Sequence, residues 1–301
     1  MSADQGAAAG GVIHDLGYRH YTGPRLGRPA IVAALCWHSL RSAFGLGRGA
    51  RAKIVPVLAL GVMCLPAIVN AVAVAQGGQG RLIDYDTYTF QLRVLVMIIF
   101  VAAQAPELVT RDLRNHVLPL YASRPMRRLD YPLAKYAAFG TACLILLDVP
   151  LLLLYLGTIV SAGGASDVWH ETRALIPGLL IGLMWAAVLA ALGLALACLT
   201  SRRAYATGVI AIYFFLTWML ASILRGIPVQ GPGPGAPLAV RLSGLISPFT
   251  LFDGVRRWLG GTSPGPLPPP GGVGVVYGLM AVLLLALGLG VLAARYRKAG
   301  A

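Results

Sequence analysis

The chain has 301 residues, of which 57% are hydrophobic and 12% are charged, and its mean hydropathy is +0.73. This composition excludes a soluble globular domain and indicates a protein that crosses a membrane several times. The formal net charge of +14 does not indicate nucleic-acid binding, because the basic residues lie at the ends of apolar runs and not among aromatic residues.

The N-terminal part of the chain is predicted to stay on the cytoplasmic side. Residues 1–30 are polar and lack the short apolar core of a secretory signal. Residues 31–48 are predicted to form an amphipathic helix in the membrane interface, with Trp37 and Phe44 facing the acyl boundary and Ser39 on the opposite, polar face. The alternative is a short tether with no part in transport.

Six apolar runs are long enough to cross a hydrocarbon core of about 30 Å, which takes about 20 helical residues. Backbone groups in lipid must pair within the chain, and barrel-type alternation is absent, so we expect an all-α membrane protein with a single transmembrane domain, residues 54–294. The predicted spans are residues 54–75, 89–109, 136–160, 175–199, 204–224 and 273–294.

The distribution of basic residues predicts the orientation of the spans. If both termini are cytoplasmic, including the tail at residues 295–301, the outer side holds only Arg81, Arg93, Arg173, Arg225, Arg241, Arg256 and Arg257. More than twice as many Lys and Arg then lie on the inner side, as the positive-inside rule requires. Arg93 falls inside the second span, and we expect its side chain to extend along the helix to the outer headgroups.

The main polar interruption lies at residues 110–135, which are predicted to form a structured cytoplasmic loop. Glu107 and Arg111 are spaced i, i+4 at the end of the second span, so they can form an ion pair that braces the helix end. Asp112 follows directly. After a leucine-rich turn the chain continues as S-R-P-x-R-R-x-x-Y-x-x-x-K, in which the fixed positions are Ser123, Arg124, Pro125, Arg127, Arg128, Tyr131 and Lys135.

This pattern resembles the loop between the second and third helices of ABC-2 type transporter permeases, although His116 and Val117 stand where many members have a Gly-Thr pair. The six-span layout agrees with that family over most of the chain. The resemblance implies a coupling helix in this loop, which contacts a separate ATPase subunit. The residues expected to couple are Glu107, Arg111, Asp112, Arg124, Pro125, Arg127 and Arg128.

The chain is not expected to be an enzyme or to hold a cofactor or a metal ion. Its three lysines follow Ala52, Ala134 and Arg297, so the Gly-Lys pair of a P-loop is missing, and ATP and Mg are expected on the partner ATPase. His170 and Glu171 begin an H-E-x-x-H motif, but Ala replaces the second His.

A Pro- and Gly-rich outer segment, residues 225–271, separates the last two spans. Its middle, residues 245–259, is apolar on a helical period and is predicted to form one short helix. The family resemblance implies a re-entrant helix that helps to close an outer gate. A surface helix anchored by Trp258 is the alternative.

Asp148 lies near the middle of the third span, where a charged carboxylate costs about 2.5–3.5 kcal/mol. It must therefore be protonated, paired or in contact with water. One hypothesis places it on the substrate path. The other treats it as a packing residue that is hydrogen-bonded to a neighbouring helix, with Asn70 and Gln104 as candidate partners.

Together these features predict the permease subunit of an ATP-driven exporter in a cell membrane, with a small or amphipathic substrate. The resemblance implies two permease chains, identical or related, and the excess of Arg over Lys is typical of a GC-rich bacterial genome. A secondary transporter is an alternative, but it should show an internal repeat, which we do not find. A polytopic enzyme would need a converging acid, base or metal set.

Overall fold

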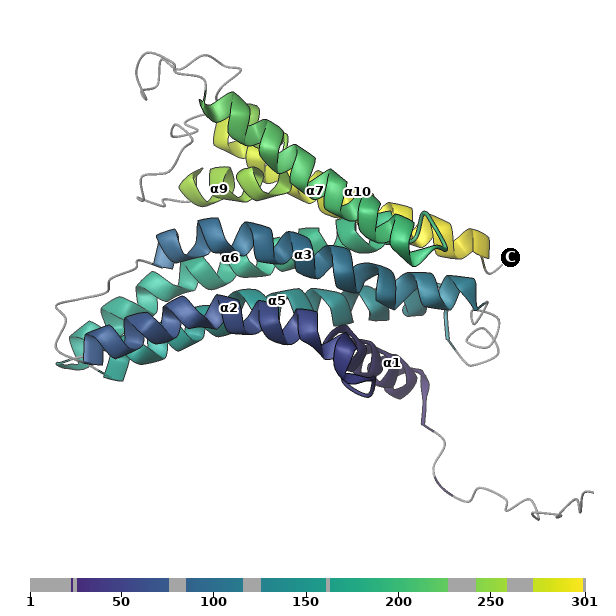
Figure 1. The fold of residues 1–301 in the computed structure, drawn as a ribbon, viewed down its shortest axis with the longest axis horizontal. Helices are drawn as coiled ribbons and strands as arrows, with labels where there is room; N and C mark the ends of the chain where they lie inside the picture. The colour runs from purple at the N-terminus through teal and green to yellow at the C-terminus, as the bar shows by residue number, and fades with distance from the viewer. Residues whose placement is uncertain are drawn as a thin grey trace, which may run out of the picture.

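A computed structural model describes residues 23, 26–75, 85–115, 126–160, 163–226, 242–258 and 273–299. In these ranges the chain forms helices and no strand. The long helices run side by side along the longest axis of the molecule (Figure 1). This arrangement lets most backbone polar groups in the apolar segments pair within their own helix, as a lipid environment demands.

Six of the described helices are long and apolar enough to cross a membrane, which confirms the predicted all-α membrane fold. Their bounds extend into polar sequence at several ends, because helical hydrogen bonding continues beyond the apolar run. The helices are α2 (Ala50–Ala75), α3 (Tyr85–Arg114), α5 (Asp130–Val160), α6 (Ala165–Ala197), α7 (Arg203–Gly226) and α10 (Gly274–Ala299).

The core of the bundle lies along α3 and α6. In these two helices 83% and 61% of the apolar window is buried, against 17–22% in α2, α7 and α10. The three peripheral helices therefore expose Leu, Ile and Val side chains that suit a lipid surface. At the core, Phe100 of α3 stacks on Phe139 of α5 with ring centroids 6.0 Å apart. Gly193 of α6 admits Val101 so closely that a Cβ there would lie 2.5 Å from the valine methyl.

Helix α1 (Arg28–Ala43) packs on α5 and α3, and this corrects the predicted assignment of its faces. Ser39, expected on the polar face, is fully buried against the bundle. Phe44, expected in the acyl boundary, packs against Phe100 of α3, with ring centroids 6.4 Å apart. Trp37 is 62% exposed. Sequence periodicity showed the apolar stripe, but contact with other helices decided which part of it is buried.

The connection from α1 to α2 is a tight turn that needs glycine. Gly45 and Gly47 have φ angles of 69° and 82°, a conformation that side-chain-bearing residues rarely adopt. A Cβ on Gly45 would also lie 2.5 Å from the carbonyl oxygen of Ala52. The turn directs Arg48 back toward α3, where it becomes part of the candidate site.

The outer segment between the last two spans contains η1 (Ser243–Leu245) and α9 (Pro248–Trp258). Every residue from Pro248 to Arg256 is buried, and α9 contacts α6, α7 and α10. Phe249 and Phe252 pack on Trp185 of α6 with centroids 5.3 and 5.1 Å away. This burial contradicts a helix that merely rests on the surface, because its apolar side enters the bundle.

Candidate functional site

One end of the bundle gathers charged residues from four helices and a turn. Figure 1 shows the C-terminal ends of α3 and α10 at the end where α1 lies. There Arg295 of α10 donates a hydrogen bond to the carbonyl of Cys198, at 3.2 Å, and Tyr296 packs on Tyr131 of α5. We call this the arginine-rich end, defined by Arg48, Arg111, Arg127, Arg128, Arg203 and Arg295.

Glu107 of α3 is the centre of one ion network at this end. Its side chain is 4% exposed and pairs with three arginines. Arg111 lies 3.0 Å away on the same helix, which confirms the predicted i, i+4 pair. Arg203 at the start of α7 lies 2.7 Å from the other carboxylate oxygen, and Arg48 of the α1–α2 turn makes the third contact. One carboxylate thus joins three segments that are distant in sequence.

A second network joins the end of α3 to the start of α5 through Asp112. The Nζ of Lys135 lies 2.8 Å from Oδ2 of Asp112, and the hydroxyl of Tyr131 donates a hydrogen bond to the same oxygen. Tyr131 and Lys135 are the Y-x-x-x-K part of the loop pattern, and their spacing places both on one face of α5. These two residues therefore hold the loop ends together and point into the bundle.

Asp130, the first residue of α5, links the same region to α1. Arg28 donates two hydrogen bonds of 2.6 Å to its two carboxylate oxygens, a bidentate geometry that fixes orientation. The backbone N–H of Arg127 donates to Asp130 at 2.8 Å. The turn before α5 is therefore anchored on both sides.

Arg127 and Arg128, by contrast, are exposed, and their side chains form no ion pair among the described residues. With Arg28 and Arg297 they border a surface pocket of about 500 Å³ that has Asp130 as its acidic member. Four guanidinium groups around one carboxylate give this surface a strong positive charge. Arg124 and Pro125 lie outside the described residues, as does Ser123.

Asp148 is separate from the arginine-rich end. It lies on α5 against Gly182 of α6, where the missing side chain makes room for the carboxylate. Its Oδ1 is buried without a hydrogen-bond partner in the described part of the chain. Gln104, one predicted partner, instead lines a pocket near Arg48 and Arg203.

Arg93 of α3 interacts electrostatically with Asp148. The side chain of Arg93 is 1% exposed, so the prediction that it extends to the headgroups is wrong. The reason is that α3 is the central helix of the bundle, and most positions along it face other helices.

The sequence matches the family model described as ABC-2 family transporter protein over residues 71–295, about three quarters of its length. The chain belongs to the ABC-2 transporter family. It is therefore a multi-pass membrane protein and the permease component of an ABC transport system. No curated protein matches the chain.

Sequence reasoning placed Glu107, Arg111, Asp112, Arg127 and Arg128 in one region of this ABC-2 permease, and the structure brings all five to the same end. Sequence reasoning did not predict the partners that come from distant parts of the chain, Arg48 and Arg203. Arg48 is 59 residues from Glu107 in sequence. A local pattern carries no signal for such a contact, because only packing of α2 and α7 beside α3 creates it.

Proposed function

We propose that this ABC-2 permease works with a separate ATPase subunit that docks on the part of the arginine-rich end formed by Arg127 and Arg128. The observation that carries the proposal is that some charged residues around the loop are paired inside the bundle and others are exposed. Asp112, Tyr131 and Lys135 face inward and tie the loop ends to α3 and α5, whereas Arg127 and Arg128 face outward without ion-pair partners among the described residues. Exposed guanidinium groups suit acidic partners, with which they form bidentate hydrogen bonds.

The proposed mechanism follows from these connections. Closure of the ATPase subunits around ATP and Mg would push the loop at residues 110–135. Because Asp112 lies in the last turn of α3 and Lys135 lies near the start of α5, the push would reach both helices at once and shift them relative to the rest of the bundle. The permease would supply no catalytic group, and the nucleotide would be bound and hydrolysed on the partner.

Two permease chains, identical or related, would then enclose the pathway, because six spans form half of the usual arrangement in this family. Both termini and the arginine-rich end would face the cytoplasm, as the positive-inside rule favours. We further propose that the substrate is exported and is small or amphipathic, and that Asp148 lies beside its route. The buried Oδ1 has no hydrogen-bond partner among the described residues, which supports a polar role for Asp148 beside its electrostatic interaction with Arg93.

The proposal is tested by reversing the two exposed charges in the full chain, co-expressed with its ATPase. Arg127→Glu with Arg128→Glu should leave the permease in the membrane but reduce co-purification of the ATPase at least tenfold, since several charge-assisted contacts become repulsive. The matched control is Arg173→Glu, an exposed arginine at the start of α6. It should retain the ATPase.

A lipid anchor is the competing role for these arginines, because each basic residue near an anionic membrane contributes about 1 kcal/mol to the free energy of membrane binding. The two roles are distinguished by comparing ATPase binding and lipid dependence between the doubly reversed permease and the unaltered chain. If the doubly reversed permease binds the ATPase as well as the unaltered chain, and only its dependence on anionic lipid weakens, docking on this surface is refuted.

A further inference from the structure

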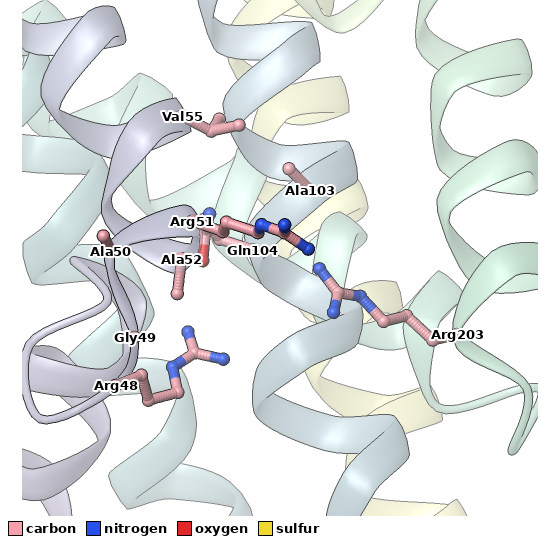
Figure 2. Close-up of a pocket in the computed structure, with 9 residues that line it drawn as sticks. All are labelled: Arg48, Gly49, Ala50, Arg51, Ala52, Val55, Ala103, Gln104 and Arg203. Carbon is pink, nitrogen blue, oxygen red and sulfur yellow. The ribbon is translucent and has the colours of Figure 1, made fainter.

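A second pocket at the arginine-rich end is not used by the proposed coupling surface. It has a volume of about 630 Å³ and lies between the start of α2, the middle of α3 and the start of α7. Figure 2 shows the arginines that border it, Arg48, Arg51 and Arg203, together with Gln104 and Val55. Its lining contains three guanidinium groups and no carboxylate.

The charge in this pocket is only partly neutralised. Arg48 and Arg203 share the single carboxylate of Glu107 with Arg111. Arg51 pairs with no carboxylate in the described part of the chain. In Figure 2 the guanidinium groups of Arg51 and Arg203 point toward one another across the pocket. Two like charges in this arrangement repel each other. An anion bound between them would offset this repulsion by accepting charge-assisted hydrogen bonds from both guanidinium groups.

Gln104 is the one uncharged polar side chain in the lining of this pocket. It lines the pocket from α3 and is 4% exposed. Its Oε1 has no hydrogen-bond partner in the described part of the chain. A buried carbonyl without a partner is rare and destabilising. The pocket thus offers guanidinium donors for an anion, whereas the Oε1 of Gln104 is covered by neighbouring protein atoms.

The position of the pocket relative to the apolar surface indicates the kind of anion. Arg51 lies one turn before the apolar run of α2, and Val55 lines the pocket directly above it. Leu58 on α2 and Ile212 on α7 are exposed large apolar residues on the flanking helices. A phosphate held by the arginines would therefore sit at headgroup level, with apolar helix surface available for attached acyl chains.

We propose that this pocket binds the headgroup of an anionic phospholipid, with its phosphate between Arg51 and Arg203. The predicted cytoplasmic position suits this ligand, because anionic lipids are concentrated in that leaflet. The site would hold a lipid between α2 and α7 whether or not an ATPase is bound. The inference therefore does not depend on the coupling role of Arg127 and Arg128.

The test measures lipid retention by native mass spectrometry on the purified full chain, titrated with phosphatidylglycerol or phosphatidylcholine. The unaltered chain should retain phosphatidylglycerol at least fivefold more tightly than phosphatidylcholine. Arg51→Gln should weaken phosphatidylglycerol binding about five- to tenfold, and Arg51→Lys should restore part of it. Arg51 is the residue of choice, because its replacement leaves the Glu107 network intact.

The matched control is Arg202→Gln, which removes the same charge next to Arg203 but does not line the pocket. It should bind phosphatidylglycerol as the unaltered chain does. Equal losses in Arg51→Gln and Arg202→Gln would show general surface attraction and overturn the proposal.

A final experiment adds inorganic phosphate and glycerol 3-phosphate without lipid. If these soluble anions bind as tightly as phosphatidylglycerol, the site serves a free phosphate compound and the lipid assignment is wrong.

Discussion

The Nζ of Lys135 on α5 lies 2.8 Å from the carboxylate of Asp112 on α3, and this pair joins the two helices that flank residues 116–125. The ammonium group is almost fully buried, whereas the carboxylate retains some exposure. Tyr131 donates a hydrogen bond to the same carboxylate oxygen. A force on the loop between these helices therefore acts on both, which is the geometric basis of the proposed coupling.

Removing the carboxylate should destabilise the loop ends. Asp112→Asn leaves the buried Lys135 without its partner, and we expect a loss of about 1–3 kcal/mol, seen as a lower midpoint of thermal unfolding in detergent. Asp112→Asn combined with Lys135→Met removes both charges and should recover most of the stability. Equal destabilisation by the single and double variants would show that the ion pair does not matter for folding.

Glu107 should be more important for stability than any one of its arginine partners. Glu107→Gln removes the one carboxylate shared by Arg48, Arg111 and Arg203, with an expected cost of about 1–3 kcal/mol in thermal unfolding. Arg111→Gln should cost at most about 1 kcal/mol, because Arg111 is largely exposed and the other two arginines remain. A larger effect for Arg111→Gln would contradict the shared network.

These cases show which features the sequence could reveal. The six long helices follow from apolar length alone, and the Glu107–Arg111 pair follows from helical spacing. The burial of Arg93 and of α9 could not be predicted in this way, because it depends on which helices surround them. Hydropathy reports affinity for a nonpolar environment but does not distinguish lipid from neighbouring protein.

Asp148 provides a test of the proposed substrate route. Asp148→Asn keeps the size of the side chain beside Gly182 and removes its charge. If the residue contacts substrate, transport or substrate-stimulated ATP hydrolysis should fall at least tenfold while the thermal unfolding midpoint is unchanged. Asp148→Leu also removes hydrogen bonding and should be at least as severe. Lower stability with normal activity would instead assign Asp148 to packing.

Orientation can be measured by cysteine labelling in a variant without native cysteines. Arg128→Cys should react with a membrane-impermeant maleimide only from the cytoplasmic side, and Ser166→Cys, at the exposed start of α6, only from outside. Intact cells and inverted vesicles give the two accessibilities. The opposite pattern would place the arginine-rich end outside the cell and would exclude ATPase docking there.

The most direct test of the central claim is site-specific crosslinking from Arg128 in native membranes. A photoreactive residue at this position should form an adduct with a subunit that binds and hydrolyses ATP, identified by mass spectrometry. The same residue at Trp169, exposed near the start of α6, is the control and should not form this adduct. Formation of the ATPase adduct from Arg128 alone is the result expected for a coupling surface. Adducts with lipid only, or with the ATPase from Trp169 as well, would contradict it.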